Sequence, residues 1–407
     1  MKLYKCRSCE SKSLSLVFSL GYQKLTGFFL KNKTSKISGG SLSMVLCNNC
    51  TLLQLGNSFN HNELYGKHYG YRSSLNRSMV DHLKKKAFKL IKTINIKKND
   101  VILDIGSNDG TFLSFFKKSN KLIGVDPTIK KFKKFYRKDI IKIINFFSYN
   151  VIKPFIGFKK VKLITTISMF YDLENPLRFA KDIEKILDTD GIWHLEQSYL
   201  PLMLKNNSYD TICHEHLEYY SLNSIEYILN QANLKIIDLE FNSINGGSFA
   251  LNVAKKSSKL NINKSIIKLA KKKEKSLKLN KTETYKKFFL RIKRSKISLL
   301  NLLDNIKKNK KKVIGYGAST KGNVILQFNK INSKIISQIA EVNKFKFNKY
   351  TPGSKIKIVS ENEIKKINPD YLLVLPWHFK KFILRKERKL LKIGKKFIFP
   401  LPKLEIV

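Results

Sequence analysis

The segment "DTICHEHLEYYSL", residues 210–222, places two histidines and a cysteine among carboxylates and tyrosines. Imidazole and carboxylate groups are the side chains with which proteins bind metals and move protons near neutral pH. In an extended segment, His214 and His216 would point to one side and Glu215 to the other. The two histidines could bind a divalent metal, but no third ligand stands at a fixed local spacing. Three hypotheses remain open here: a metal site, a general base with supporting groups, or a polar loop with ordinary histidines.

A second motif that could bind a ligand is "VILDIGSNDGTFL", residues 101–113, where an apolar strand is followed by a glycine loop and a helical segment. Glycine at the end of a strand lets a ligand approach the backbone closely. The next apolar run, "LIGVD", ends about twenty residues on at Asp126, which can accept hydrogen bonds from both hydroxyls of a ribose. The loop lacks the G-x-G-x-x-G pattern of dinucleotide-binding proteins, so the spacing predicts a nucleoside cofactor. An empty α/β domain with a glycine turn is the alternative.

Four of the five cysteines form two pairs, "CRSC" with Cys6 and Cys9, and "CNNC" with Cys47 and Cys50. Two thiolates on each tight turn can supply the four corners of a zinc tetrahedron. A pair of redox disulfides is the alternative, which a reducing cytoplasm disfavours. A closed four-thiolate site has no open coordination position, so the predicted zinc is structural. Cys213 stands apart from these pairs.

Composition limits the class of protein. A chain of 407 residues with 43% apolar residues is expected to fold into two or three domains. The net charge of +49 suggests nucleic-acid binding, but lysine supplies all but nine of the 79 basic residues. Proteins that grip phosphates or guanine edges commonly use arginine forks, so a solvated lysine surface is the favoured interpretation. It could still attract an anionic substrate.

The chain also lacks the sequence features of a membrane or secreted protein. No apolar run reaches the ~18 residues that a membrane span needs. The first residues carry charge and cysteine where a signal peptide has an apolar core. We therefore expect a soluble, cytoplasmic protein.

The elements that must position these motifs follow from hydrophobic spacing. Residues 77–94 carry apolar side chains near helical spacing. Short apolar runs then alternate with helical stretches, which predicts a mainly parallel sheet with crossover helices: "VILDIG", "KLIGVD", "VKLITTISMF" and "GIWHLEQSY". Residues 255–312 are lysine-rich and helical in pattern, and we expect them to cover a core and join two domains. A second α/β pattern follows, from "KVIGYGAST" through "DYLLVLPWHF" to "KFIFPLP".

Several separate motifs, taken together, resemble one family. The glycine loop and Asp126 are similar to motif one and the second-strand acid of class I S-adenosylmethionine-dependent methyltransferases. Within that class the chain resembles the sugar C-methyltransferases, through pieces that run in order from Cys6 to Pro402: "CRSC…CNNC", "YGYRSS", "LDIGSNDGTFL", "NFFS", "DTICHEHLEYYSL", "NGGSFALNVA", "GYGASTKGN", "NKYTPGSKIKI", "DYLLVLPWHF" and "FPLP". The resemblance covers nearly the whole chain.

The resemblance implies an α/β protein of three domains. A small zinc-binding domain would occupy residues 1–58, and a methyltransferase domain with a class I Rossmann-like sheet residues 59–245. A second Rossmann-like α/β domain, which helps to hold the sugar nucleotide, would occupy residues 246–407, with the helical linker at 255–312.

The resemblance also assigns residues to S-adenosylmethionine. The glycine loop would line the methionine end of the cofactor through Asp104, Gly106, Asn108 and Gly110. Asp126 would bind the ribose, and Phe147 and Ser148 would lie near the adenine. Tyr71 is similar to the tyrosine that closes over the cofactor, or Tyr69 if the register shifts by two. The alternative for Tyr71 is a loop aromatic that packs on a neighbour.

For the first segment, the resemblance implies that His216 is a base that removes a proton next to a ketone, with Glu215 as its close support. Neutral imidazole suits that step near physiological pH. His214 belongs to the same predicted catalytic set, with a buried histidine bound to backbone as the stronger alternative. The family usually has tyrosine where this chain has Cys213. That departure puts a hydrogen bond to the enolate or the sugar in question.

The segment "GYGASTKGN", residues 315–323, would open the C-terminal domain. Glycines, small hydroxyl residues and a lysine after an apolar strand are typical of a phosphate nest at a helix start. Lys321 is predicted to contact the diphosphate of the sugar nucleotide, with Asn323 beside it. Trp377 or His378 would line the cleft. A second Rossmann-like domain that serves packing alone is the alternative.

The sequence thus predicts a zinc-containing methyltransferase that uses S-adenosylmethionine to methylate a ring carbon of a nucleotide-linked keto-sugar, for surface polysaccharide or another glycoconjugate. The sequence does not fix the oligomeric state, for which a monomer is favoured. A membrane partner is not expected and nucleic acid is disfavoured. Three alternatives remain. A sugar O-methyltransferase would also use a histidine. A nucleic-acid methyltransferase would fit the charge, although "SMFYDLEN" has no N-P-P-Y-like tetrad. A binding protein could keep the fold without catalysis.

Overall fold

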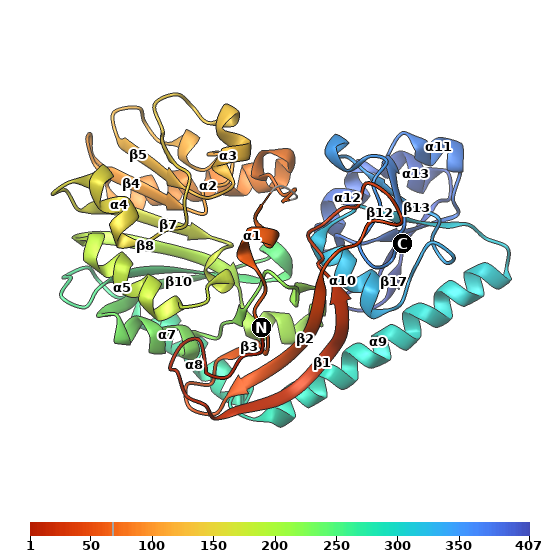
Figure 1. Cartoon of the computed structure of the whole chain (residues 1–407), viewed down its shortest axis with the longest axis horizontal. Coiled ribbons are helices and arrows are strands. Elements are labelled where there is room, and N and C mark those ends of the chain that lie inside the picture. The colour runs from red at the N-terminus through yellow and green to blue at the C-terminus, as the bar shows by residue number, and fades with distance from the viewer. Residues whose placement is uncertain (67–68) are drawn as a thin grey trace.

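The computed structural model describes residues 1–66 and 69–407, and its three sheets form two lobes joined by a long hairpin (Figure 1). The central lobe is built on a seven-stranded sheet and the C-terminal lobe on a six-stranded sheet. A four-stranded antiparallel sheet at the N-terminus runs along one side of both lobes (Figure 1). The predicted site residues are therefore distributed over two lobes and the sheet that connects them.

The seven-stranded sheet has the order β10-β11-β8-β7-β4-β5-β6. Its strands are β4 Val101–Ile105, β5 Lys121–Val125, β6 Ile141–Ile143, β7 Val161–Ile167, β8 Leu187–Ser198, β10 Leu234–Asn242 and β11 Ser248–Lys255. The five strands from β4 to β8 are parallel, whereas β11 is antiparallel to both of its neighbours. This order, with an antiparallel strand inserted beside the edge, confirms the predicted class I methyltransferase sheet.

Helices cover both faces of this sheet, which is why β4 is buried at every position. The helices of the central lobe include α2 Arg77–Ile94, α3 Ile129–Phe132, α4 Tyr149–Ile156, α5 Pro176–Ile186, α6 Leu200–Lys205 and α7 Leu222–Gln231. The predicted helix at residues 77–94 is confirmed. Its N-cap Asn76 accepts a hydrogen bond from the Ser78 amide, and Asn95 ends the helix in the left-handed conformation.

The C-terminal lobe repeats the architecture on a smaller scale, as predicted. Its sheet order is β14-β13-β12-β15-β16-β17, parallel except for β17. The strands are β12 Val313–Tyr316, β13 Gln338–Glu341, β14 Lys357–Ser360, β15 Tyr371–Val374, β16 Lys396–Phe399 and β17 Glu405–Ile406. The helices are α10 Thr320–Phe328, α11 Glu363–Ile367, α12 Lys380–Lys386 and α13 Arg388–Lys392.

The lysine-rich stretch between the lobes folds as α8 Lys264–Ser276 and the 27-residue α9 Thr282–Lys308. The apolar stripe of α9 packs on the N-terminal hairpin, where Phe18 contacts Phe288 and stacks on Phe289. The expected helices are confirmed, and Tyr285 and Phe288 are the completely buried aromatic residues of α9. Among the helices described here, none is both long and apolar enough to cross a membrane.

The N-terminal hairpin physically joins the two lobes. It consists of β1 Leu14–Lys24 and β2 Gly39–Cys47, continued by β3 Leu53–Leu55 and the short helix α1 His61–Leu64. At one end β3 pairs with β9, Glu218–Tyr219, which lies just after His214 and His216 in the sequence. At the other end, the side chain of Gln327 in α10 accepts from the Lys24 amide at 2.8 Å and donates to the Lys24 carbonyl at 3.1 Å.

The packing of α9 on β1 generates a test of this architecture. Phe288 is completely buried, so Phe288→Ala should lower the free energy of unfolding by about 3–5 kcal/mol through lost burial and cavity formation. Urea denaturation would measure the change. Phe158→Ala is the matched control, because Phe158 is fully exposed and should shift stability by less than about 0.5 kcal/mol. Equal effects of the two substitutions would contradict the described packing.

Candidate active site and metal centre

The glycine loop after β4 is held in one conformation by its neighbours. Gly106 and Gly110 both have φ of +75°, a region that favours glycine. A Cβ added to Gly110 would lie 2.6 Å from the ring of Tyr136. The hydroxyl of Tyr136 hydrogen-bonds with the Ser107 hydroxyl at 2.7 Å and donates to the Asn108 carbonyl at 3.1 Å. The loop is therefore preformed.

Asp126 lies at the end of β5, facing this loop. One carboxylate oxygen accepts from the Asn108 amide at 2.9 Å, and the other accepts from the Thr128 amide at 2.6 Å. Each oxygen keeps a further lone pair, so the carboxylate can still accept from the two hydroxyls of a ribose. These residues fit a nucleoside cofactor. Asp104 has a different environment, because it accepts from the Thr165 hydroxyl at 2.6 Å across β4 and β7, and burial raises its pKa to about 7.

Residues 69–74, which we call the strap, lie against the glycine loop. The Ser73 amide donates to Asn108 Oδ1 at 3.0 Å, and the Ser74 amide donates to an Asp109 carboxylate oxygen at 3.0 Å. Asn108 Nδ2 donates back to the Tyr71 carbonyl at 3.3 Å. The backbone of the strap is thereby fixed, while the Tyr71 side chain remains 47% exposed. This placement is compatible with the predicted closure of Tyr71 over a cofactor.

The two residues expected near the adenine follow β6 and begin α4. Ser148 is the N-cap of that helix, and its hydroxyl accepts from the Val151 amide at 3.4 Å. The ring of Phe147 packs on Phe179 with centroids 4.7 Å apart. The Ser148 hydroxyl thus already has a capping role.

His214 and Glu215 lie in a turn, so the two histidines do not share one side as they would in an extended segment. The His216 amide donates to the Cys213 carbonyl at 3.2 Å, which reverses the chain between the 3-10 turn Tyr209–Thr211 and β9. The two imidazoles consequently face different surroundings. His214 is completely buried, with Nε2 donating to the Gln23 carbonyl at 3.2 Å and its ring against Phe59. Burial lowers the pKa of His214 to about 4, and this placement favours the alternative of a backbone-bound histidine.

His216 has the geometry of an oriented neutral base. Its Nδ1 lies 2.7 Å from the Thr211 carbonyl oxygen, so Nδ1 carries the hydrogen and Nε2 keeps a lone pair. The ring packs on Tyr171 with centroids 4.1 Å apart. Burial, followed by the positive charge of Lys321, lowers the pKa of His216 to about 3. The imidazole is therefore neutral at physiological pH.

Two carboxyl groups accompany the turn. Glu215 accepts from the Thr26 hydroxyl at 3.4 Å, and a Cβ on Gly27 would collide with its carboxylate. Glu215 therefore contacts the N-terminal hairpin, and burial raises its pKa. Asp172 is not predicted from the sequence. Its Oδ1 is buried with no hydrogen-bond partner among residues 1–66 and 69–407, and burial and the charge of Glu215 raise its pKa well above the usual range.

The predicted residues of the C-terminal lobe reach the central lobe. Lys321 Nζ donates to the Asn245 carbonyl at 2.8 Å, and Trp377 Nε1 donates to Asp210 Oδ2 at 2.8 Å. His378 packs edge-on against Trp377. Asn323 is instead buried in the contact with the hairpin, where its side-chain Nδ2 donates to the Thr26 carbonyl at 2.7 Å.

The predicted phosphate nest before α10 is already bonded within the protein. The amides of Gly317, Ala318 and Gly322 donate to the Ala340 carbonyl, the Glu341 carboxylate and the Ser319 hydroxyl. Their donors are used, and the carboxylate of Glu341 adds negative charge beside them. This geometry does not favour a diphosphate at that loop.

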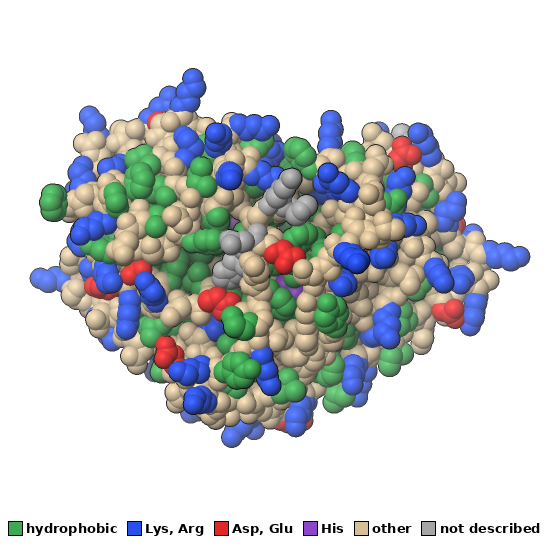
Figure 2. Space-filling model, in the orientation of Figure 1, with side chains coloured by type: hydrophobic (Ala, Val, Ile, Leu, Met, Phe, Trp, Pro, Cys, Tyr) green, Lys and Arg blue, Asp and Glu red, His purple; other side chains and the backbone are tan. Residues whose placement is uncertain are grey.

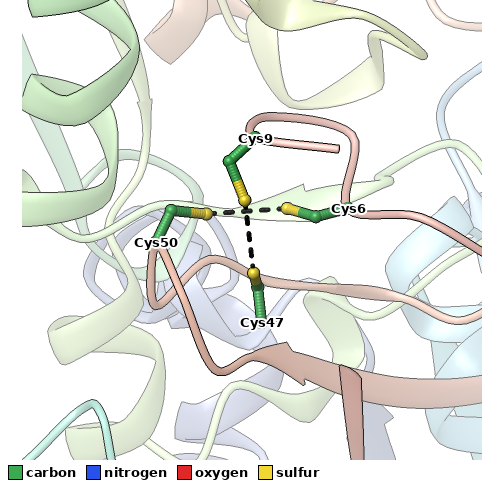
Figure 3. Close-up of side chains that lie close together, drawn as sticks. All are labelled: Cys6, Cys9, Cys47 and Cys50. Atoms are coloured by element: carbon green, nitrogen blue, oxygen red, sulfur yellow. Dashed lines mark hydrogen bonds between the residues drawn. The ribbon is translucent and has the colours of Figure 1, made fainter. Parts of the chain in front are cut away.

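The four paired cysteines converge on one point (Figure 3). Their sulfur atoms all lie within 4.8 Å of one another, with Cys6–Cys50 and Cys9–Cys47 each at 3.5 Å. A tetrahedral zinc–thiolate site has sulfur atoms about 3.8 Å apart, so these residues fit zinc. Gln54 Nε2 donates to Cys6 Sγ at 3.2 Å and helps to fix that ligand. The centre is structural because four protein ligands complete it.

The sheet order, the glycine loop with its acid and the cysteine cluster define a class I S-adenosylmethionine-dependent methyltransferase with a zinc-binding unit. Three family models match successive parts of the chain: "Putative zinc binding domain" at residues 6–65, "Methyltransferase domain" at 76–239 and "C-methyltransferase C-terminal domain" at 243–402. Together these models cover most of the chain, which is thus similar, in order, to a zinc-binding domain, a methyltransferase domain and a C-methyltransferase C-terminal domain.

Individual proteins share less than a third of their residues with this chain. The chain is 27% identical over 420 aligned positions to C-methyltransferase NovU from Streptomyces niveus, covering 99% of this chain and 96% of that protein. Among solved structures, it is similar to an S-adenosylmethionine-dependent methyltransferase from Clostridium acetobutylicum at 13% identity. That match covers 43% of this chain and 92% of the other, with a TM-score of 0.34.

The cysteine cluster generates a prediction about metal content. The purified protein should contain about one zinc per chain, measured by elemental analysis. Cys47→Ser removes one thiolate and should abolish most of the bound zinc and lower Tm, because a structural zinc contributes folding energy directly. Cys213→Ser is the matched control, since Cys213 lies outside the cluster and its loss should leave the zinc in place. Full zinc content in the Cys47 variant would rule out this centre.

The buried His214 generates a prediction about pH and stability. Its pKa of about 4 in the folded chain lies below the ordinary value of about 6.5. The unfolded chain therefore binds the proton more readily, and this group's stabilisation is lost as pH falls below 6.5 towards 4. The free energy of unfolding falls between pH 7 and pH 5 in the wild type, partly because His214 becomes protonated on unfolding. In His214→Gln this fall should be smaller by up to about 2 kcal/mol. Urea denaturation at both pH values would show identical losses if the histidine were accessible to protons.

Proposed function

We propose that this C-methyltransferase transfers a methyl group to a carbon next to the ketone of a nucleotide-linked sugar. The observation that carries this proposal is the neutral His216, which is oriented by the Thr211 carbonyl and lies near enough to Lys321 of the C-terminal lobe for that charge to act on its pKa. S-adenosylmethionine, when bound, supplies an electrophilic methyl group. Carbon beside a ketone becomes nucleophilic only when a base removes a proton, so this chemistry requires a group such as His216.

The hydrogen bond from His216 Nδ1 to the Thr211 carbonyl supports the role of base. It keeps the Nε2 lone pair available and prevents the ring from rotating away. When Nε2 gains a proton, the same carbonyl stabilises the positive imidazolium through Nδ1–H. The low pKa of about 3 keeps the base unprotonated before the reaction.

The surrounding acids fit the handling of a polyhydroxylated substrate. Asp172 has an unsatisfied buried carboxylate oxygen within the described chain, and the charge of Glu215 helps to raise its pKa. Such oxygens can bind the hydroxyl groups of a sugar. Cys213 is completely buried and burial raises its pKa well above the usual range, so its thiol stays neutral. A neutral thiol is a weak hydrogen-bond donor and contributes little to an enolate.

The nucleotide part of the substrate would lie against the C-terminal lobe, whose Lys321, Trp377 and His378 reach the same junction. We place the enzyme in the cytoplasm, where nucleotide-linked sugars are made, and its product in glycoconjugate synthesis. The lysine and arginine side chains are spread over the visible face in Figure 2 rather than gathered along one groove, which disfavours a nucleic-acid substrate.

A sugar O-methyltransferase remains the competing function, since deprotonation of a hydroxyl also uses a histidine. The name of the relative from Streptomyces niveus specifies C-methylation, which favours carbon as the acceptor. NMR of the product separates the two functions, because it shows whether the new methyl group is bonded to carbon or to oxygen.

His216 provides the decisive experiment. The protein is incubated with S-adenosylmethionine and a panel of nucleoside-diphosphate keto-sugars, and the gain in mass is followed. His216→Gln should lower kcat by about 10²–10⁴-fold, the usual contribution of a general base. His82→Gln is the matched control, because His82 pairs with Glu196 near α2 and β8 and should keep near wild-type activity. Full activity of the His216 variant, or no turnover of any ketone by the wild type, would refute the proposal.

A further inference from the structure

Lys321 belongs to the C-terminal lobe but makes its hydrogen bond in the central lobe. It lies in the first turn of α10, and its Nζ donates to the Asn245 carbonyl at 2.8 Å. Asn245 is itself fixed, because its Nδ2 donates to the Ser168 hydroxyl at 3.2 Å next to the end of β7. The ammonium group is thus held at a defined position at the edge of the methyltransferase sheet.

The loop around Lys321 offers little to a phosphate. The amides of Gly317, Ala318 and Gly322 donate within the protein, and the acceptor of the Ala318 amide is Glu341, a carboxylate that would repel an anion. The other lysine at this loop, Lys346, is also engaged, since its Nζ donates to the Ala318 carbonyl at 2.7 Å and lies near Glu341. The geometry therefore separates Lys321 from its own loop and directs it to the junction.

The groups that feel the charge of Lys321 are those of the reaction centre. Its positive charge contributes to the lowered pKa of both His216 and His378. The charge of Lys321 also acts on the pKa of Asp210, whose Oδ2 accepts from Trp377 Nε1 while Oδ1 has no hydrogen-bond partner in the described chain. Tight packing supports this junction, because a Cβ on Gly246 would lie 3.1 Å from the Trp377 ring.

We infer that Lys321 is a catalytic residue that the C-terminal lobe supplies to the methyltransferase site, where its ammonium group stabilises the enolate oxygen. This inference rests on the proposed function. In the step concerned, the C–H bond beside the ketone breaks and the proton moves to His216 Nε2. The electron pair of that bond forms the C=C bond of the enolate, and the negative charge moves to the former ketone oxygen.

A fixed cation suits this step because it requires no reorganisation when the charge develops. Preorganised donors aimed at a developing oxyanion are each worth about 10²–10³ in kcat. Lys321 is held by the Asn245 carbonyl before substrate arrives, and half-burial at the junction keeps its charge poorly screened by water. The C-terminal lobe would then complete the catalytic centre as well as bind the substrate.

Enolate formation can be measured without methyl transfer. A keto-sugar nucleotide that the wild type methylates is incubated in D₂O without S-adenosylmethionine, and NMR follows loss of the hydrogen beside the ketone. Lys321→Met should slow this exchange, and kcat in the complete reaction, by about 10²-fold or more with little change in KM. Lys321→Gln, which can still donate to the Asn245 carbonyl, should show the same loss and serves if the methionine variant does not fold.

Lys346→Met is the matched control, because it removes a half-buried lysine of the same lobe and should leave the exchange rate near wild type. Exchange at the wild-type rate in both Lys321 variants would overturn this inference but not the proposed function. A rise in KM without loss of exchange would also overturn it and indicate a substrate-binding lysine. A wild-type protein that neither exchanges nor methylates any ketone would overturn the proposed function and this inference with it.

Discussion

The hydrogen bond between His216 Nδ1 and the Thr211 carbonyl is the constraint on which the rest of the site depends. It selects one tautomer, and only that tautomer has a lone pair on the outward nitrogen. The turn that brings the two groups together leads directly into β9, which pairs with β3 after the N-terminal hairpin. Cys6 and Cys9 precede β1, Cys47 is the last residue of β2, and Cys50 follows it. The cysteine cluster and the turn that carries the proposed base His216 are therefore connected through one continuous sheet.

The same hairpin explains how two lobes form one site. At its far end, Gln327 and Asn323 of α10 hydrogen-bond the backbone of Lys24 and Thr26. Two residues away from Asn323 along α10, Lys321 crosses to the central lobe. The hairpin thus fixes the helix that carries the lysine. Asn323 contributes to the site by anchoring this helix to the hairpin.

Much of the fold could be predicted from the sequence, because buried parallel strands and an amphipathic helix such as α2 have strong local signals. The glycine loop and the cysteine pairs were equally readable, since their chemistry is encoded in residue type and spacing. The turn at His214 and Glu215 was not, because β9 forms only through pairing with a strand more than 150 residues earlier. Asp172, Asp210 and Asn245 were missed for a similar reason: their significance comes from partners in distant segments.

A cation beside a base has opposing effects on catalysis. The charge of Lys321 disfavours protonation of His216, which weakens the base, yet the same charge favours the enolate that forms when the proton leaves. The two effects nearly cancel if the ammonium is equally close to both groups. Catalysis gains only if the substrate oxygen comes closer to Nζ than the imidazole does, since electrostatic interaction falls with distance. Asn245, by fixing Nζ at the edge of the central sheet, controls that difference in distance and hence whether the lysine accelerates the reaction.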